Sequence, residues 1–427
     1  MKAAFYECDI TPPLGCFAWG HYKPCYPIEV HDRLYAKAVV IEDNGELAAI
    51  VVIDSCSIPP EMHDIVTKRI FEYTGIPADK VCIASNHAHW GASVSDSPEI
   101  GCTADPTYKD VAFRLTADAV ILAYNRLKDV DVKFGTSIAP GLAFSRNFET
   151  VDGKYVCHGR NRDDVKHAIS EPDEELPILI FEENGKPCGA IVVFACHQCT
   201  VHQKVTGYSG DYSSVLAKRL KEKYGSDFVS LFLIGTCGDV NHVNPDRSQE
   251  VTDHIIIGNK LAEYYENSMN DAKPLAEGGV ASKKEYITIA RRSADPKLSQ
   301  DRIERLSSPL SLMRLRNLVY YVSRPEPEST DLPVQCIKIG DTLIACLPGE
   351  IYTEFGRKIK ANSPFKHTMV VENCNTYCGY IPTKEAFDPE KDNLYETSLC
   401  YHSCHIPEAG DILVENALRI ANEIKGE

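Results

Sequence analysis

The chain has 427 residues, 44% of them hydrophobic and 25% charged, which is the composition of a globular protein rather than a disordered one. The formal net charge is −16, from 61 acidic and 45 basic residues, and no block of lysine and arginine stands out. A nucleic-acid partner and stable association with an anionic membrane are therefore not expected.

The first residues, MKAAFYECDITPPLGCF, carry Glu7, Asp9 and two prolines before any apolar run of signal-peptide length. No uninterrupted apolar run approaches the length that spans a membrane. The 17 cysteines are odd in number, and several lie inside apolar runs, which favours reduced thiols. We therefore expect a cytoplasmic protein.

In the first third of the chain, the run LYAKAVVIEDNGELAAIVVIDS predicts a β-hairpin that turns at Asn44-Gly45. Helices are expected over 59–75 and 105–127. Between them, VCIASNHAHWGAS predicts a buried strand that runs into His87 and His89. Residues two apart in extended chain point the same way, so the two imidazoles are expected to share one face at the strand's exit.

The middle of the chain repeats this pattern. A second hairpin is predicted around Asn184-Gly185, and its return strand ends at His197. A helix is expected over 210–225. The apolar run FVSLFLIG then leads into a polar loop that contains Asp239, Asn241 and His242.

In the last third, residues 295–323 are expected to be helical and 324–333 to form an exposed connector. A third hairpin turns at Gly340-Asp341 and leads to Glu350. We expect one domain over 1–427, with a subdomain over 333–427 that contributes to the same site. Hairpins are too frequent for an all-parallel sheet and no GxGxxG opens a helix, so the expected fold is an α/β layered sandwich of mixed β-sheets flanked by helices.

Polar residues at strand ends provide the candidate site, because ligands of layered α/β proteins gather where strands open into loops. Two or three imidazoles with one carboxylate form the ligand set of a catalytic zinc site, which leaves a position open for water. The alternative is that these residues only end strands. Cys196/Cys199 could be a redox dithiol, and Cys374/Cys378 with Cys400/Cys404 could form a structural zinc site, although small core residues fit all three pairs better.

Several of these segments together resemble the neutral, non-lysosomal ceramidases. SNHAHWGAS is similar to their THTHSGP segment, FACHQCTV to F-x-x-H-x-T-S, and LPGEIYTEFG to PGE-x-T-x-x-G. The stretch YCGYIPTKEAFDPEKDNLYETS resembles Y-x-x-Y-x-T-x-E-E-Y, and DITPPLG, HDRLYAKAVVIED and the SRN around Arg146 agree as well. The resemblance runs in order from about Asp9 to Tyr395, so it covers that family's catalytic domain.

The resemblance implies a fold, a cofactor and site residues. One Zn²⁺ ion would be held by four ligands: His87, His197, Glu350 and Tyr380. His89 and Tyr395 match residues that polarise the scissile carbonyl or hold its oxyanion, and Arg146 matches a position that contacts substrate. Water activated on zinc would then attack an amide carbonyl.

The chain also departs from the family. Asn241 stands where ceramidases carry a serine and cannot be a nucleophile, so water must attack directly, with Asn241 or His242 at most orienting it or the substrate. The family's immunoglobulin-like domain has no expected counterpart after the catalytic domain. Trp90 replaces a small residue and is expected to narrow a lipid-accepting groove. Further polar candidates are His158, His202, His402 and His405.

The leading functional hypothesis is a zinc-dependent amidohydrolase that acts on a small soluble N-acyl molecule. A zinc esterase or lactonase on the same scaffold is the alternative, because the metal chemistry does not distinguish a C–N from a C–O bond. A non-catalytic, metal-dependent binding protein is the third hypothesis, motivated by the missing serine.

Overall fold

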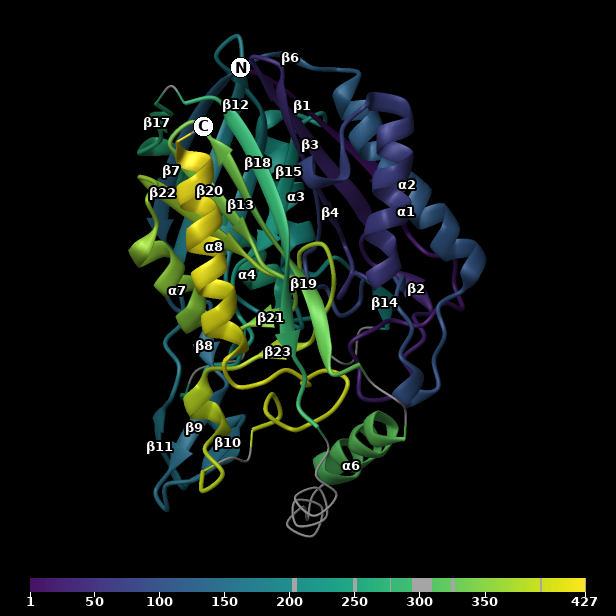
Figure 1. Cartoon of the computed structure of the whole chain (residues 1–427), viewed down its shortest axis with the longest axis vertical. Helices are drawn as coiled ribbons and strands as arrows, with labels where there is room; N and C mark the ends of the chain where they lie inside the picture. The colour runs from purple at the N-terminus through teal and green to yellow at the C-terminus, as the bar shows by residue number, and fades with distance from the viewer. Residues whose placement is uncertain are drawn as a thin grey trace.

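The computed structural model of the chain describes residues 1–201, 206–248, 252–276, 278–293, 309–323, 327–391 and 394–426. Three large β-sheets lie at its centre, and pairs of helices cover their outer faces (Figure 1). The expected mixed α/β fold is confirmed.

The first sheet has the strand order β5-β4-β3-β1-β6. Its strands are β1 (Lys2–Asp9), β3 (Tyr35–Asp43), β4 (Glu46–Ile53), β5 (Val81–Ser85) and β6 (Lys128–Asp129), and helices α1 (Pro60–Thr74) and α2 (Pro106–Tyr124) lie on one face. Along β3, Ala38 and Val40 pack in the cluster formed with these helices, whereas Val39 and Ile41 face the centre of the molecule. This alternation is the period of two that a strand imposes.

The second sheet has the order β15-β13-β12-β7-β17. Its strands are β7 (Asp131–Ile138), β12 (Glu175–Glu183), β13 (Lys186–Phe194), β15 (Val229–Ile234) and β17 (Lys273–Pro274), and its helices are α3 (Asp211–Tyr224) and α4 (His254–Asn270). Leu216 of α3 and Leu261 of α4 pack with Ile178 and Val192 of the sheet. Helix α4 was not predicted from the sequence.

The third sheet has the order β18-β19-β20-β22. It consists of β18 (Val280–Ala290), β19 (Ser329–Ile339), β20 (Thr342–Cys346) and β22 (His367–Val371), and α7 (Thr353–Asn362) and α8 (Ala409–Lys425) cover it. Strand β19 pairs with β18 along its whole length, so residues 333–339 share a sheet with residues before 333. The subdomain boundary stays a prediction.

The remaining described elements are short and lie around the loops. They are β2 (Glu29–Val30) with β14 (Gly207–Tyr208), β8 (Phe144–Ser145) with β16 (Val240–Asn241), β21 (Glu350–Ile351) with β23 (Tyr380–Ile381), the three-stranded sheet of β9 (Asn147–Thr150), β10 (Tyr155–Cys157) and β11 (Val165–Ala168), and α6 (Pro309–Val322). The part of the expected 295–323 helix that precedes Pro309 lies outside the described residues.

The same unit occurs once in each large sheet: a hairpin, a helix and a strand parallel to the hairpin's second strand. The units are β3-β4-α1-β5, β12-β13-α3-β15 and β19-β20-α7-β22. The first two hairpins turn where predicted, with positive φ at both turn residues: 53° and 89° at Asn44-Gly45, and 53° and 74° at Asn184-Gly185. Asn-Gly is favoured there because both positions require a left-handed backbone.

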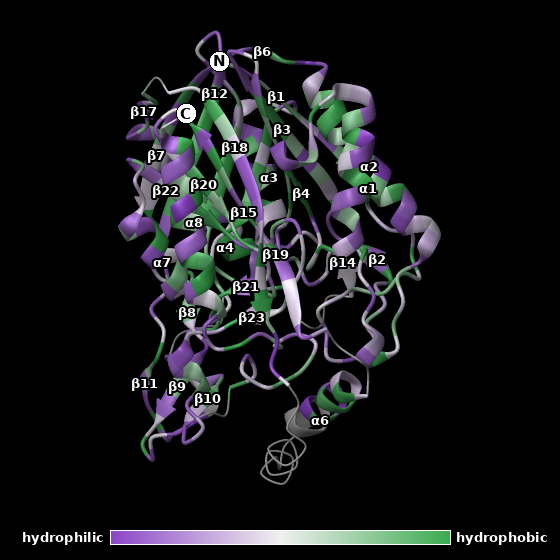
Figure 2. Ribbon diagram, viewed as in Figure 1, coloured by the Kyte–Doolittle hydropathy of each residue, from purple (hydrophilic) through white to green (hydrophobic). Residues whose placement is uncertain are grey.

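The three sheets pack against one another around a common apolar core. Ile50 and Val52 come from the first sheet, Leu179 and Leu231 from the second, and Ile344 from the third. Figure 2 shows that the strands at the centre are mostly hydrophobic, while the outer surfaces of the covering helices carry polar residues. Within the described residues, no helix combines the length and the apolar character needed to cross a membrane.

Candidate metal centre and its cavity

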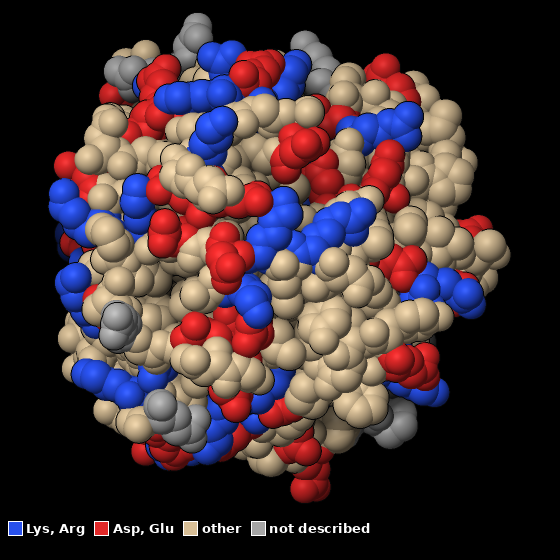
Figure 3. All heavy atoms as spheres, turned by 90° about the horizontal axis from the view of Figure 1, so that it is seen from above, with Lys and Arg blue, Asp and Glu red and all other residues tan. Residues whose placement is uncertain are grey.

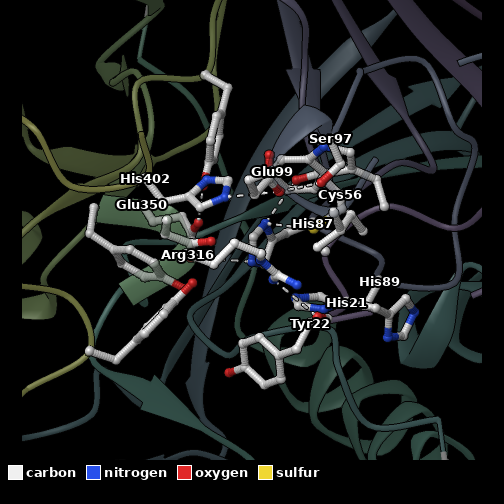
Figure 4. Close-up of a pocket in the computed structure, with 17 residues that line it drawn as sticks. His21, Tyr22, Cys56, His87, His89, Ser97, Glu99, Arg316, Glu350 and His402 are labelled. Atoms are coloured by element: carbon white, nitrogen blue, oxygen red, sulfur yellow. Dashed lines mark hydrogen bonds and ion pairs between the residues drawn. The ribbon is translucent and has the colours of Figure 1, made fainter. Parts of the chain in front are cut away.

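A small cavity opens among the loops that follow the central strands (Figure 4). Its volume is about 50 Å³. Six of its lining residues belong to the candidate metal centre or its surroundings: His87, His89, Glu350, Tyr377, Tyr380 and Tyr395. They come from segments that are far apart in the sequence, so only the folded chain brings them together.

Three predicted ligands, His87, His197 and Glu350, converge beside this cavity. One ligand atom from each can be chosen so that all three lie within 4.8 Å of one another. Glu350 Oε2 lies 3.0 Å from His197 Nε2 and 3.4 Å from His87 Nε2. All three side chains are buried, so solvent does not satisfy them.

The outer nitrogen of each imidazole is held by a backbone carbonyl. His87 Nδ1 lies 2.8 Å from Cys56 O, and His197 Nδ1 lies 2.8 Å from Cys237 O. A ring nitrogen that donates to a carbonyl must carry the proton, which leaves the Nε2 lone pair free to bind a cation. His87 Nε2 is buried and has no hydrogen-bond partner among the described residues, as expected of an atom that awaits a ligand.

The protonation states also suit a metal. Burial lowers the pKa of His87 to about 4, against the raising effect of the Glu350 charge. Burial also tends to raise the pKa of Glu350, but His87 and His197 outweigh it and hold that pKa well below its usual range. A neutral imidazole and a charged carboxylate are the forms that bind a divalent cation.

His87 and His89 both reach the cavity, but not by strand alternation as predicted. Strand β5 ends at Ser85, and His87 has a left-handed backbone with φ of 66°. The two rings meet edge to face with centroids 5.0 Å apart, so they approach from different directions. Asn86 fixes this turn, because its side-chain amide donates to Asp54 Oδ1 at 2.7 Å.

His89 itself is kept neutral. Burial, followed by the neighbouring His87, lowers the pKa of His89 well below its usual value. Its Nε2 is buried without a hydrogen-bond partner in the described part of the chain. A neutral imidazole in this position can exchange a hydrogen bond with a bound substrate.

Tyrosines form another side of the cavity. Tyr380 pairs with Glu350 across the two short parallel strands β21 and β23, and its ring stacks on His197 at a centroid distance of 6.5 Å. Tyr395 packs edge to face on Tyr380, with centroids 5.6 Å apart. Both predicted tyrosines therefore line the cavity, whereas their roles stay predictions.

Tyr377 is a site residue that the sequence did not reveal. Its hydroxyl donates to Glu350 Oε1 at 2.8 Å, and so holds the carboxylate oxygen that faces away from the two imidazoles. It also lies 3.3 Å from His402 Nδ1. The spacing of Tyr377 and Tyr380 in TYCGY was the available signal, but only the fold shows that both turn toward Glu350.

Arg146 and Asn241 are not among the residues that line the cavity. The Arg146 guanidinium is buried behind it, donates to Glu396 Oε1 at 2.6 Å and lies over the Tyr380 ring at 5.1 Å. A buried guanidinium needs such partners because desolvating its charge is costly. Asn241 lies in β16, and its side-chain oxygen accepts the Val243 N–H at 2.9 Å.

Of the further candidates, His402 lines the cavity, whereas His158 and His405 do not, and His202 lies outside the described residues. The narrowing that we expected from Trp90 does not apply to this cavity. Trp90 packs on His21 at a centroid distance of 4.7 Å but does not line the cavity, whereas Trp19 does.

A buried carboxyl group links two of the segments that carry the candidate ligands. Glu372 accepts the backbone N–H of Ile351 at 2.7 Å and that of Cys237 at 3.1 Å. Burial raises the pKa of Glu372 well above its usual value, and the Glu350 charge adds to this. Glu372 thereby links Ile351, which follows Glu350, to Cys237, whose carbonyl oxygen accepts from His197 Nδ1.

Two cysteine-containing groups also have ligand atoms close enough to hold a metal. Cys82, Cys346 and Cys374 meet in the central apolar core, away from the cavity. Cys56 joins His87 and His89, but burial raises its thiol pKa well above the usual value, which disfavours the thiolate that binds metals. All 17 cysteines are free, as expected of reduced thiols.

No protein-family model matches this sequence, and no curated protein matches it either. Solved structures do resemble it. The neutral ceramidase from Pseudomonas aeruginosa is 18% identical with a TM-score of 0.74, and the match covers 100% of this chain and 74% of that one. A ceramidase complexed with C2 is 16% identical with a TM-score of 0.71, covering 100% and 75%. The expected neutral-ceramidase-like fold is confirmed.

Proposed function

We propose, from this neutral-ceramidase-like fold, that the chain is a zinc-dependent hydrolase that cleaves the amide bond of a small N-acyl molecule. The observation that carries the proposal is the convergence of His87 Nε2, His197 Nε2 and Glu350 Oε2 beside a cavity, with both Nδ1 atoms bonded to carbonyl oxygens. Two imidazoles and one carboxylate are a ligand set that zinc uses in catalytic sites. The residues present therefore fit the ion.

Tyr380 is proposed as the fourth ligand of this single ion. It lines the same cavity and pairs with Glu350. Zinc bound here would supply a nucleophilic water and polarise the substrate carbonyl. In the overall reaction, the water oxygen bonds to the acyl carbon, the C–N bond breaks, and the leaving nitrogen takes up a proton.

The protein's own groups would orient the substrate. His89, neutral and without a partner at Nε2 among the described residues, is proposed to donate a hydrogen bond to the scissile carbonyl. Tyr395 is proposed to stabilise the negative charge that develops on the carbonyl oxygen. Arg146 is proposed to hold Tyr380 in place from behind, since its guanidinium lies over that ring at 5.1 Å and is itself fixed by Glu396. Its contact with substrate stays a prediction.

Water, and no side chain, is proposed as the nucleophile. Asn241 occupies the position of the family serine, and its side-chain oxygen is already bonded to the backbone. If Asn241 orients the substrate, it would do so indirectly, by fixing the backbone at Val243.

The first test is the metal content of the purified protein, measured by plasma mass spectrometry. Wild type is expected to hold close to one zinc per chain, and His87→Ala and His197→Ala to lose it. His63→Ala is the matched control, because it removes a buried imidazole on α1 that does not line the cavity. Wild type without zinc, even after zinc is supplied, would overturn the metal proposal.

The second test is hydrolysis of short N-acyl amides, with the matching esters run alongside. Activity should disappear with a chelator and return with zinc. Metal binding without turnover of amide or ester would leave the metal site intact and contradict the hydrolase.

A further inference from the structure

Arg316 presents an uncompensated positive charge to the cavity. It lies on α6 and is one of the lining residues, and Figure 4 shows its side chain extending into the group formed by His87, Glu350 and Tyr22. Its Nη2 donates to Tyr22 O at 3.3 Å. Within the described part of the chain, no carboxylate lies within ion-pair distance of it. An arginine has five N–H donors, so most of its bonding capacity is available.

The other carboxylate in the cavity does not supply that charge. Glu99 lines the cavity, but Oε1 faces His402 Nε2 at 3.6 Å and accepts the Ser97 hydroxyl. Glu350 belongs to the proposed metal centre. With a divalent cation bound there as well, the cavity would carry more positive than negative charge.

Buried polar atoms around the same cavity also await partners. Besides His87 Nε2 of the proposed centre, four atoms of lining residues have no hydrogen-bond partner in the described part of the chain: His21 Nε2, His89 Nε2, Glu99 Oε2 and Asn317 Oδ1. A buried polar atom without a hydrogen bond is unfavourable, so these positions favour a polar occupant over an alkyl chain. The cavity therefore suits a molecule with several hydrogen-bonding groups.

The size of the cavity decides which part of the substrate meets Arg316. A volume of about 50 Å³ accommodates a reacting amide and a very short acyl group. Pockets for drug-sized ligands have roughly 300–1,000 Å³, so the rest of the substrate must lie at the mouth. The Arg316 residue is exposed there, on the solvent side of the cavity.

We infer that Arg316 binds a carboxylate carried next to the scissile amide, which makes short-chain N-acyl amino acids the substrate class. This inference rests on the proposed function for the identity of the scissile bond. A planar guanidinium and a carboxylate match in geometry and can form two parallel hydrogen bonds. Arg316 is thus a specificity-determining residue at the mouth.

The test compares N-acetylglycine with N-acetylglycinamide, which differ in charge but hardly in size. Binding to the zinc-loaded protein is measured by calorimetry, and hydrolysis by release of the amine. Wild type should favour the carboxylate by about ten- to a hundredfold, the range for a hydrogen bond to a charged group. In Arg316→Gln most of this preference for the carboxylate should be lost.

Zinc also attracts carboxylates, but wild type and Arg316→Gln would both contain it. A difference in carboxylate preference between these two proteins therefore reports the effect of Arg316. Arg314→Gln is the control, since it removes an arginine from the same helix that does not line the cavity. Arg316→Glu adds a positive test, because it should reverse the preference in favour of N-acetylethylenediamine, which ends in an ammonium group.

The outcomes distinguish the two proposals. A carboxylate preference in binding that is lost in Arg316→Gln supports the inference even if neither compound is hydrolysed, in which case the hydrolase proposal alone fails. Equal binding of both compounds to wild type, no binding of either, or a preference that survives in Arg316→Gln would overturn the inference.

Discussion

At the scale of single residues, the centre depends on groups that fix the ligands from outside. Tyr377→Phe removes the hydroxyl that holds Glu350 Oε1 and leaves the ring in place. We expect zinc affinity to fall by about tenfold or more, since outer partners of metal ligands typically contribute that much. Competition with a chromophoric chelator measures the change.

Tyr208→Phe is the matched control for this experiment. It removes another largely buried tyrosine hydroxyl, which donates to Cys16 O at 2.8 Å and does not line the cavity. Equal zinc affinity in Tyr377→Phe and wild type would show that the Glu350 carboxylate needs no support from this hydroxyl.

The sequence predicted which residue types meet at the centre, but not how they are oriented. His87, His197 and Glu350 were identified at strand ends and through family resemblance, and they do converge. The left-handed backbone of His87 was not predictable, because it depends on the turn that Asn86 and Asp54 hold. The role of Tyr377 was not predictable either, because its partner Glu350 is 27 residues away in the sequence.

At the scale of elements, the connection from β20 to β21 positions Glu350 through a glycine. Gly349 has φ of 73°, and a Cβ there would overlap the carbonyl oxygen of Gly379 and lie 2.5 Å from Cys378 Sγ. Gly349→Ala should therefore separate β21 from β23, with loss of zinc and a fall in unfolding free energy of more than about 2 kcal/mol. Denaturant unfolding and metal content measure the two effects.

Gly75→Ala isolates the backbone part of that cost. Gly75 has a similar φ of 74°, but nothing lies within 4 Å of the position its Cβ would take. It should lose only about 1 kcal/mol, the usual penalty for a left-handed residue that is not glycine. Similar losses in both variants would mean that the contact at Gly349 is relieved by movement.

The contact between β18 and α1 gives a pH dependence. Lys284 Nζ lies 2.5 Å from His63 Nε2 and donates to Val81 O at 3.1 Å. Burial lowers the pKa of Lys284 from 10.5 to about 8. Between these pH values the Lys284 amine holds more proton in the unfolded chain than in the folded one, so this residue should contribute a rise in unfolding free energy with pH of at most about 3 kcal/mol. Buried thiols with raised pKa values, such as Cys56 and Cys237, contribute in the opposite direction, so the Lys284 part is read as a difference between wild type and a variant.

Lys284→Met should remove this rise, because the variant has no amine to deprotonate. Unfolding free energies from urea titrations at pH 8 and 10 would test the prediction for wild type and variant. Equal pH dependence in wild type and Lys284→Met would mean that the amine keeps an ordinary pKa in the folded protein.

Hairpins were the elements that the sequence predicted best, because Asn-Gly turns between apolar runs are a local signal. Helices α1, α2 and α3 were also predicted, by their spacing and their terminal residues. Helix α4 was not predicted, although the Asp253 side chain caps it by accepting the Ile256 N–H. Sheet order was not predictable, because it depends on contacts between distant segments.

At the scale of the whole molecule, the surface shows no sign of a polyanionic partner, and the cavity favours a small substrate. Figure 3 shows acidic and basic side chains interspersed over one face, with no extended basic area. With a cavity of about 50 Å³, activity should fall steeply as the acyl chain lengthens. We expect kcat/KM to be highest for N-acetyl substrates and lower by at least about tenfold for N-octanoyl ones.

Rates for an N-acyl series with one constant amine would test this expectation. Trp19→Ala, which enlarges the cavity lining, should flatten the dependence on chain length. A rate that increases with chain length in wild type would indicate a lipid substrate, and the cavity would then have to widen when substrate binds.

The proposed ligands follow strands of three different sheets, and this has a consequence for the order of assembly. His87 emerges early in synthesis, His197 near the middle, and Glu350 and Tyr380 only when most of the chain has been made. A nascent chain can complete its first two hairpin–helix units with the imidazoles in place and still lack the carboxylate. Capture of the proposed ion would therefore be a late event, and a chain that stops before β21 would carry the two histidines without the proposed carboxylate ligand.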